Sequence, residues 1–557
     1  MKRNVRHSPA QAPRVAALIS LAATLILTAS GLEGATTVNA KSASQSDVAA
    51  AIASAADGDT VMIPGGTATW THTLPIRKAI TLQGSGVGVT IIKDSVQKGR
   101  LIDWTLAAGY PSRLTGIEFQ DGGRPNHALA PGGIIHIDGS NDGSQFRWDH
   151  SKWGDMNGVA VADTVIGVFD HLDITINGKM NFFLYIYGNH WNGDTGGNGD
   201  KSWTMPANYG SSQFLFIEDC TTTKVRPGGI TFLTSAFAGA RFVVRYNRLN
   251  ADDTVNNHGT ESRRRSGRAM EIYNNTFAGN DRGRQIGGIR GGGVLIHDNT
   301  ITGYQGAIAV FSLNCYRELS TSVQTFGGAD GTNVWDANYA APPNNGPFTV
   351  SAVSRFTVTV SGSPNWQNNQ WRHYTILRDA GRFGFGLITG NTQNQISWAG
   401  GFQRNMTINV GDTFHITRVN HALDQPGVGA GSLISGSNPK PPPGWNNQVT
   451  EPCYAWNNTS NGAAINLFAP DNQYSIRENE HYFNSAMPSY TPYVYPHPLT
   501  KGLLPEQMTQ NAKANSQHNL RKQRRPWGGK KLDKKKQNKT KESPTNVMAD
   551  GQENVDN

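Results

Sequence analysis

The chain has 557 residues, of which 63 are glycine and only 16% are charged, and this composition favours turn-rich β structure over helical bundles. Its three cysteines are too few for a disulfide scaffold and form no CxxC metal motif. The net charge is +9, of which residues 501–557 carry +7 and residues 1–36 carry +3, so the body between them is nearly neutral at −1. A basic, nucleic-acid-binding body is therefore excluded, and we expect no specific nucleic-acid partner.

The N-terminus has the pattern of a secretory signal. Basic residues precede a 15-residue apolar run over residues 15–29, and small residues follow it. The run is short for a membrane span, and no later stretch reaches about 18 apolar residues. We expect residues 1–36 to be a signal peptide and the mature protein to be secreted or at the bacterial cell surface, with no transmembrane span. An N-terminal membrane anchor is the alternative.

A short phrase recurs along the body of the chain. EIYNNTF (Glu271–Phe277) is echoed 24 residues later by LIHDNTI (Leu295–Ile301). Similar phrases recur mostly every 21 to 28 residues, centred on Asp149, Asp170, Asp219, Asn247, Asn274, Asp298 and Asn457, with Asn479 one place out of step. A period near 24 with short β-rich runs predicts a β-solenoid with one coil per repeat.

The repeat also predicts columns of equivalent residues. The gap of 49 residues between Asp170 and Asp219 indicates two units, one of them around residues 182–190. The position after the central Asp or Asn predicts a hydrogen-bonded ladder of four asparagines: Asn275, Asn299, Asn458 and Asn479. His150, His171 and Cys220 are assigned to the same column; they carry metal-ligand atoms, although hydrogen bonding at the turn is favoured.

Residues 46–70, SDVAAAIASAADGDTVMIPGGTATW, resemble the entry of the pectin-lyase-like right-handed parallel β-helix proteins. YTPYVYPHPLT (residues 490–500) is similar to the closing phrase of many secreted bacterial members. The resemblance implies an all-β fold, a right-handed single-stranded parallel β-helix, with an N-terminal capping helix. We expect that helix to bury Val48, Ala49, Ile52, Ala53 and Ala56. The superfamily holds lyases, hydrolases, esterases, phage spikes and adhesins, so the resemblance does not specify an activity.

Two further segments complete the predicted organisation. Alternating strand patterns with Gly and Asn turns predict a small β-rich insertion module over residues 318–425, which divides the β-helix into residues 37–317 and 426–500. The insertion either contacts carbohydrate or shapes a cleft. Residues 501–557 contain few apolar side chains and predict a disordered basic tail. The tail is either solvated or bound to an anionic surface such as lipid or acidic polysaccharide.

The densest polar cluster lies on the coils around the opening phrase. β-Elimination at a uronate needs a cation to neutralise the carboxylate, a base to remove the adjacent proton and an acid for the leaving oxygen. We expect the catalytic residues to come from this cluster: His258, Arg268, Glu271, Tyr273, Arg290 and His297. The arginines would clamp the carboxylate, and a histidine or the tyrosine would act as base or acid. Glu218 and Glu271 would hold Ca²⁺, the expected cofactor, or orient a histidine.

The sequence therefore predicts a protein that acts on an extracellular polysaccharide, with lyase chemistry favoured. A glycoside hydrolase ranks lower, because the aspartate set and GHG motif of β-helix hydrolases are missing. The rival is a non-catalytic, adhesin-like protein that binds glycans through Tyr246, Tyr273 and Trp456. The enzyme is favoured if the polar cluster converges in one groove, and the binding protein is favoured if the cluster scatters.

Overall fold

The computed structural model of the chain describes residues 35–140, 144–197, 199–226, 231–250, 253–258, 265–278, 286–303, 310–313, 345–372, 374–378, 385–398, 408–418, 424–430, 449–468 and 476–502. The apolar run of the expected signal peptide and the basic tail from residue 503 lie outside these residues. Within the described ranges, no helix is both long enough and apolar enough to span a membrane.

Three long sheets make up the body, named here A, B and C. Sheet A has twelve strands: β1 (Thr37–Asn39), β2 (Thr60–Ile63), β5 (Thr81–Gly84), β8 (Ser112–Thr115), β11 (Gln145–Asp149), β14 (Ile166–Asp170), β17 (Leu215–Glu218), β20 (Arg241–Arg245), β23 (Ala269–Tyr273), β26 (Gly293–His297), β35 (Cys453–Trp456) and β39 (Tyr482–Phe483). Sheet B has eleven: β3 (Gly66–Trp70), β6 (Thr90–Asp94), β9 (Glu118–Asp121), β12 (Lys152–Gly154), β15 (Asp173–Ile176), β18 (Thr221–Lys224), β21 (Arg248–Asn250), β24 (Thr276–Ala278), β27 (Thr300–Thr302), β36 (Thr459–Ser460) and β37 (Ala463–Ala464). Sheet C has ten: β4 (Leu74–Ile76), β7 (Ile102–Thr105), β10 (Ile135–Asp138), β13 (Ala160–Asp163), β16 (Phe182–Tyr187), β19 (Thr231–Ala236), β22 (Asp253–Asn257), β25 (Gly287–Ile289), β28 (Phe311–Leu313) and β38 (Leu467–Phe468).

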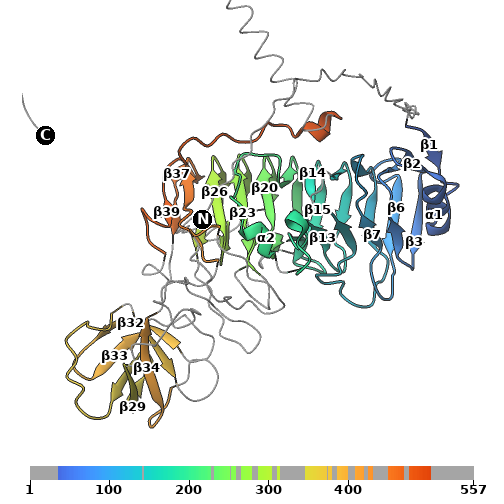
Figure 1. Cartoon of the computed structure of the whole chain (residues 1–557). Helices are drawn as coiled ribbons and strands as arrows, with labels where there is room; N and C mark the ends of the chain where they lie inside the picture. Colours follow the sequence, from blue (N-terminus) through green and yellow to red (C-terminus); the bar gives the residue numbers. More distant parts are fainter. Residues whose placement is uncertain are drawn as a thin grey trace, which may run out of the picture. The chain divides into compact units, whose positions relative to one another are not determined.

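The strands visit the three sheets in turn, so the chain winds as a parallel β-helix. β11, β12 and β13 enter sheets A, B and C, and β14 then pairs in parallel with β11 to start the next coil. Each coil advances by the spacing of paired strands, about 4.8 Å. Figure 1 shows the coils stacked from β1 at one end to β39 at the other. The predicted all-β parallel β-helix is confirmed.

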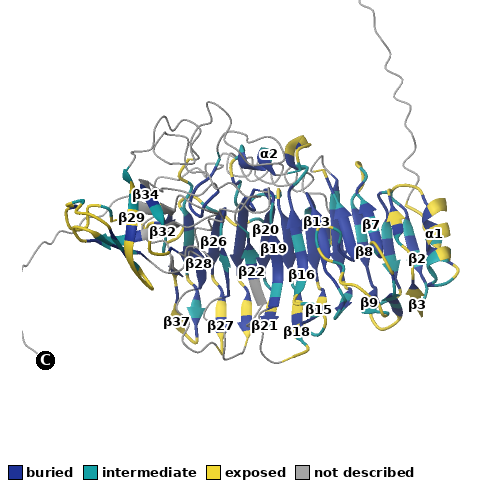
Figure 2. Ribbon diagram, turned by 90° about the horizontal axis from the view of Figure 1, so that it is seen from below, coloured by how far each residue is buried: buried dark blue, intermediate teal, exposed yellow. Residues whose placement is uncertain are grey.

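The interior of the β-helix is apolar along its length. Figure 2 shows buried residues running through the strands of successive coils. One continuous core cluster extends from the first coil to the last. Aromatic rings fill the middle of this core: Trp148 meets Phe169 edge to face at 5.4 Å, and Trp153 meets Phe183 in the same way. Because an open solenoid end exposes unpaired backbone, the first coil is covered by helix α1 (Gln45–Ser54).

The sequence predicted the capping helix but assigned part of its buried face wrongly. Val48 and Ile52 are buried as expected. Ala51 and Ala55 complete the buried face, whereas Ala49, Ala53 and Ala56 are exposed. Positions three and four apart share one face of a helix, so 48, 51, 52 and 55 form a single stripe. Ser44 caps the helix by accepting a hydrogen bond from the Asp47 amide.

The asparagine ladder is present, but its register differs from the prediction. Asn247, Asn275, Asn299 and Asn458 stack in successive coils, and each side-chain amide donates to the oxygen of the next at 2.9–3.0 Å. All four are buried, whereas Asn479 is exposed and belongs to no such ladder. Cys220 occupies the ladder position one coil earlier, where the Asn247 side chain accepts its amide hydrogen.

The residue before the ladder explains the shift in register. In each coil it adopts a left-handed conformation with φ between 45° and 56°: His150, His171, Asp219, Tyr246, Asn274, Asp298 and Asn457. Asn and Asp tolerate this conformation best, which is why their phrases recur. The prediction instead aligned Asp149, Asp170 and Asn247 with the later turn residues. His150 and His171 are therefore exposed turn residues, and Cys220 does not share their column.

The 49-residue interval is one coil and not two. β14 pairs directly with β17, and residues 182–190 contribute β16 to sheet C and not a turn after sheet A. The extra length is a long connection between β16 and β17. It contains the short helices η1 (Trp191–Gly193) and α2 (Asp200–Trp203).

A separate six-stranded barrel lies between β28 and β35 in the sequence. Its strands are β29 (Asn345–Ser354), β30 (Thr357–Val360), β31 (Tyr374–Arg378), β32 (Phe385–Asn391), β33 (Gln395–Trp398) and β34 (Thr413–Arg418). All of its pairings are antiparallel, and it has its own apolar core around Val358, Ile388 and Phe414. These strands fall within the predicted insertion at 318–425; the domain boundaries themselves stay predictions.

A C-terminal arm, residues 487–502, runs back over the outer face of sheet A and ends in helix η2 (Pro498–Lys501) (Figure 1). Arg245 donates from Nη1 to the Tyr493 carbonyl at 2.7 Å and from Nη2 to the Val494 carbonyl at 2.9 Å. Three coils further back, on β11, the Arg147 guanidinium donates to the carbonyls of Leu499 and Thr500. The arm therefore covers the middle of sheet A and excludes water from it.

Candidate functional site

The sequence-predicted site residues lie in two separate places. His258 and Arg290 follow β22 and β25 at the carboxyl edge of sheet C. The others, Glu218, Arg268, Glu271, Tyr273 and His297, belong to sheet A or to the segment that enters it. These residues therefore do not converge in one groove, the condition under which the sequence favoured an enzyme over a binding protein.

The sheet A group is buried under the C-terminal arm. Glu271 accepts hydrogen bonds from the Tyr490 hydroxyl and, at 2.8 Å, from the Gly210 amide, and burial raises the pKa of its carboxyl. Glu218 pairs with Arg245 at 2.6 Å and accepts from the His497 amide, and burial raises its pKa as well. Each carboxylate is thus held by protein donors in a site closed to solvent.

Glu218 and Glu271 do not form the expected Ca²⁺ site. They lie on β17 and β23, which are separated by β20, so about 10 Å of strand spacing divides them. Ca²⁺ needs six to eight oxygen ligands at about 2.3–2.6 Å, and the two groups cannot share one ion over that distance. Each of the two carboxylates already accepts hydrogen bonds from the protein donors around it.

The aromatic stripe expected to bind sugars is also covered. Tyr273, His297 and Trp456 stack in parallel with ring centroids 4.7 and 4.1 Å apart, and Tyr246 stacks on Tyr495 of the arm at 3.6 Å. The Tyr273 hydroxyl accepts a hydrogen bond from Arg245, and burial raises the pKa of this phenol. Burial lowers the pKa of His297. Tyr273 and His297 are buried, and Tyr246 and Trp456 keep only part of their surface exposed, so no continuous aromatic stripe is open to a glycan.

Arg268 is likewise enclosed. Its guanidinium lies 5.0 Å from the Trp203 ring, donates to the Met205 carbonyl and pairs with Glu451 at 2.6 Å. It ties the connection after β16 to the segment before β35, which is a structural role.

His258 and Arg290, by contrast, form a half-exposed pair. Arg290 Nη2 lies 2.7 Å from His258 Nδ1, and His258 Nε2 lies 2.9 Å from the Ser235 hydroxyl. The imidazole stacks on Phe237 at 3.9 Å. Because a guanidinium can only donate, Nδ1 must be the acceptor, and the proton of the neutral ring then resides on Nε2 and is donated to Ser235.

Ser235 extends this pair to a phenol. Tyr185 is its register partner in the neighbouring coil; burial raises the pKa of that phenol, and the smaller effect of the Ser235 hydroxyl lowers it. Arg290, His258 and Ser235 thus form a chain of hydrogen bonds, and Tyr185 lies beside Ser235 at its end. Ser235 is fully buried beneath the half-exposed rings of Tyr185 and His258.

The pair belongs to a longer column on the outer face of sheet C. Register and ring contacts align one residue from each of six successive coils at the carboxyl ends of the strands: Asp138, Asp163, Tyr187, Phe237, His258 and Arg290. We call this set the sheet C column. Its first members are acidic, its middle is aromatic and its last member is cationic. About 14 Å of strand spacing separates Asp163 from His258.

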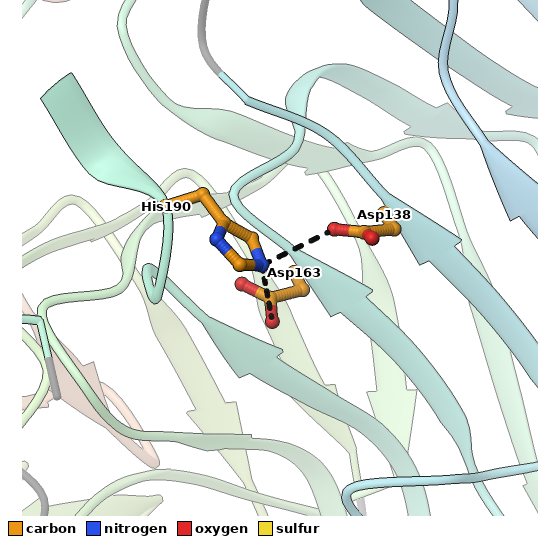
Figure 3. A group of neighbouring side chains, drawn as sticks. All are labelled: Asp138, Asp163 and His190. Carbon is orange, nitrogen blue, oxygen red and sulfur yellow. Dashed lines mark ion pairs between the residues drawn. The ribbon is translucent and has the colours of Figure 1, made fainter. Parts of the chain in front are cut away.

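The acidic end of the column is completed by a histidine. Figure 3 shows Asp138, Asp163 and His190 converging, with His190 Nε2 lying 3.6 Å from Asp138 Oδ1 and 3.9 Å from Asp163 Oδ2. Their ligand atoms all lie within 4.8 Å of one another. Asp163 accepts hydrogen bonds from Thr164 and from the main chain and side chain of Asn189. Burial, and then the neighbouring Asp163, raise the pKa of Asp138.

The sequence interpretation missed Asp138, Asp163, His190, Tyr185 and Ser235. A signal was present for the two aspartates, because each ends a short apolar run, IIHID and VAVAD, and the two are 25 residues apart. That spacing is the period of the coil. The recurring Asp or Asn phrase marks only the turn after sheet A, so it does not reveal this second column.

No family model matches this chain, and no curated protein matches it. Among solved structures, an alginate lyase from Paenibacillus sp. str. FPU-7 is 13% identical, with a TM-score of 0.28, and covers 49% of this chain and 98% of its own. The ORF18 protein of Geobacillus virus E2 is 12% identical, with a TM-score of 0.29, and covers 68% of this chain and 76% of its own. At TM-scores this low, neither structure bears on the activity of this chain. Strand pairing alone defines it as a parallel β-helix protein.

Proposed function

We propose that this chain cleaves a uronate-containing extracellular polysaccharide by β-elimination, on the outer face of sheet C. The observation that carries the proposal is the chain of hydrogen bonds from Arg290 through His258 to Ser235, with Tyr185 beside Ser235 in the next strand. It supplies a cation, an imidazole and a phenol on a half-exposed surface. These are the group types that elimination requires.

In the proposed reaction, Arg290 neutralises the uronate carboxylate, which acidifies the adjacent C–H. The C–H bond breaks as the proton passes to a base, a C=C bond forms, and the glycosidic C–O bond breaks. The leaving oxygen then takes a proton. His258 Nδ1 becomes the base when Arg290 turns from it to the substrate carboxylate. The Nε2 proton then passes to Ser235, the Ser235 proton passes to the neighbouring Tyr185, and the phenol releases its own proton to the leaving oxygen.

A divalent cation would assist at the acidic end of the column. Asp138, Asp163 and His190 offer two carboxylate oxygens and an imidazole nitrogen within 4.8 Å, and the like charges of the two carboxylates favour a cation between them. Because Ca²⁺ takes oxygen ligands, this mixed set of two oxygens and a nitrogen suits a transition metal ion and not the Ca²⁺ expected at Glu218 and Glu271. A bound ion would add a second positive charge for the substrate's carboxylates.

Glycoside hydrolysis is the second candidate, and one observation favours it. Asp138 and Asp163 lie side by side, and the pKa of Asp138 is raised whereas Asp163 accepts three hydrogen bonds. A carboxyl with a raised pKa beside a hydrogen-bonded carboxylate is the arrangement that glycosidases use. A non-catalytic glycan-binding protein is the third candidate. The separation of the predicted site residues into two places favours a binding protein. The Arg290–His258 pair and the cluster of Asp138, Asp163 and His190, which lie along the sheet C column, favour an enzyme.

A substrate panel distinguishes these candidates. The full chain, with Ca²⁺ or with chelator, is incubated with pectate, alginate, chondroitin and neutral glycans, while ultraviolet absorbance reports unsaturated ends and a second assay reports reducing ends. Absorbance growth on a uronate polymer supports elimination. Reducing ends that form without ultraviolet absorbance would show that the chain is a hydrolase and not a lyase. Retention on a glycan column with neither product would show that the chain binds the glycan without cleaving it.

A further inference from the structure

Two exposed histidines lie side by side on the outer edge of sheet A, away from the sheet C column. His150 and His171 occupy the left-handed turn position in successive coils, with φ of 45° and 52°. Their rings are parallel to within 4° and their centroids are 4.8 Å apart, the spacing of the coils. The two side chains are 58% and 49% exposed, so both rings reach solvent.

Each imidazole is oriented by the aspartate that precedes it. His150 Nδ1 lies 2.7 Å from Asp149 Oδ2, and His171 Nδ1 lies 2.9 Å from Asp170 Oδ2. A carboxylate only accepts, so Nδ1 carries the proton in both rings, and the lone pair of each neutral ring is on Nε2. Two Nε2 lone pairs are thus presented next to each other at the surface.

The aspartates are themselves fixed by arginines. Arg113 pairs with Asp149 at 2.5 Å, and Arg147 donates to both oxygens of Asp170 at 2.8 Å. Both carboxylates are completely buried. The two cations and two anions cancel, so this part of the surface does not repel a metal ion strongly.

We propose that His150 and His171 form a surface site for a divalent transition metal of the Zn²⁺, Ni²⁺ or Cu²⁺ class, bound through their Nε2 atoms. A ligand histidine that donates its other N–H to a carboxylate is the usual arrangement around such ions, and it raises the basicity of the ring. The class of metal follows from the imidazole nitrogens, since Ca²⁺ and Mg²⁺ take oxygen ligands. This site is independent of the proposed function.

Sharing one ion requires a small movement. Metal–nitrogen bonds of about 2.0–2.1 Å bring two ligand nitrogens closer than the present ring spacing, so the two rings must tilt toward each other. Their exposure leaves room for that tilt. Asp219 occupies the same column one coil further on, and its carboxylate, which accepts from Tyr495 at 2.7 Å, lies next in line as an additional ligand.

Titration calorimetry with Zn²⁺ on the chelator-treated full chain tests the proposal. The variants are His150→Asn and His171→Asn, because Asn274 and Asn457 already occupy this column in the same left-handed conformation. Each variant is made in a His190→Asn background, so that the sheet C cluster contributes no imidazole, and the control is His72→Asn, an exposed imidazole bonded to Thr71. We expect each of the first two variants to weaken Zn²⁺ binding at least tenfold, and His72→Asn not to do so.

Two results would overturn the site. One is Zn²⁺ binding that is unchanged in both His150→Asn and His171→Asn, or absent from the parent chain. The other is loss of all Zn²⁺ binding in the His190→Asn background itself, which would place the ion in the sheet C cluster. An excess of Ca²⁺ should not displace Zn²⁺ from the parent chain, and displacement would point to oxygen ligands instead.

Discussion

Arg290 donates a hydrogen bond from Nη2 to Nδ1 of His258, 2.7 Å away, and thereby fixes the imidazole with its proton on Nε2, facing Ser235. The two residues are 32 positions apart in the chain but belong to neighbouring coils of sheet C. This contact joins a cation to a proton-transfer group on the outer face of the β-helix. The proposed β-elimination depends on this contact.

The Ser235 hydroxyl should matter for rate more than for folding. Replacing Ser235 with Ala removes the link between His258 and Tyr185, and we expect kcat on a cleaved uronate polymer to fall about 10² to 10⁴-fold with KM little changed. The check is the initial rate of ultraviolet absorbance growth. Ser351→Ala, which alters an exposed hydroxyl on the barrel, is the control and should keep the parent rate. Equal rates for both variants would remove Ser235 from the mechanism.

The buried Glu218–Arg245 pair should be important for stability. Arg245→Met leaves a fully buried carboxylate without its 2.6 Å partner, and we expect a loss of about 3–5 kcal/mol in the free energy of unfolding. Urea unfolding measures it. The matched control, Arg77→Met, breaks an exposed pair with Asp103 and should cost about 1 kcal/mol or less. Similar losses for the two variants would contradict this ranking.

The asparagine ladder should be sensitive to interruption. Asn275→Ala removes a side chain that donates to the Val244 carbonyl and to Asn299, and that accepts from Asn247. Buried partners are left unsatisfied, so we expect a loss of about 3 kcal/mol. Asn157→Ala, which loses a single half-buried hydrogen bond to the Arg124 carbonyl, should cost about 1 kcal/mol. A smaller loss at Asn275 than at Asn157 would be inconsistent with a structural ladder.

The arm should loosen as the pH falls, because His497 is completely buried. Burial, aided by Arg245 and Arg147, lowers its pKa to about 3 from the ordinary value of 6.5. Below pH 6.5 the unfolded chain binds a proton that the folded chain rejects. Stability contributed by the neutral ring is therefore present above pH 6.5 and is lost progressively down to about pH 3, by at most about 1.4 kcal/mol per pH unit.

The His497→Asn variant isolates this effect. Asn can still accept the hydrogen bond from the Leu499 amide at the start of η2, and the His497 amide to Glu218 is main chain and remains. Urea unfolding between pH 4 and 6.5 should show a shallower loss of stability with falling pH in the variant than in the parent chain. His136, whose pKa burial lowers to about 4, contributes equally to both. Identical slopes would exclude His497 as the titrating group.

The sequence predicted the fold best where the same type of residue adopts the same backbone conformation in successive coils. Asn and Asp at the left-handed turn, followed by a buried Asn, revealed the coil period and the ladder. The predicted register is wrong by one residue where His150, His171 and Tyr246 adopt that conformation, because an adjacent Asp or Asn resembles the usual turn residue. The capping helix followed from the resemblance of residues 46–70 to the entry of known β-helix proteins, and its buried face needed only the three-and-four spacing of a helix.

The candidate site was harder to predict, for two physical reasons. The sheet C column uses a different residue type in nearly every coil, so no repeated phrase marks it. The burial of Glu271 and Tyr273 depends on an arm more than 200 residues away, as the 219-residue separation of Tyr490 from Glu271 illustrates. Local spacing placed His258 and Arg290 on neighbouring coils but could not show what covers sheet A.

The most direct test of the proposed site compares two arginines. On the uronate polymer identified by the substrate panel, kcat/KM is measured for Arg290→Gln and for Arg477→Gln, an exposed arginine paired with Glu480. We expect Arg290→Gln to lose about 10²-fold or more, since it removes the charge that stabilises the developing enolate, and Arg477→Gln to keep the parent value. Undiminished turnover by Arg290→Gln would contradict a catalytic site on sheet C.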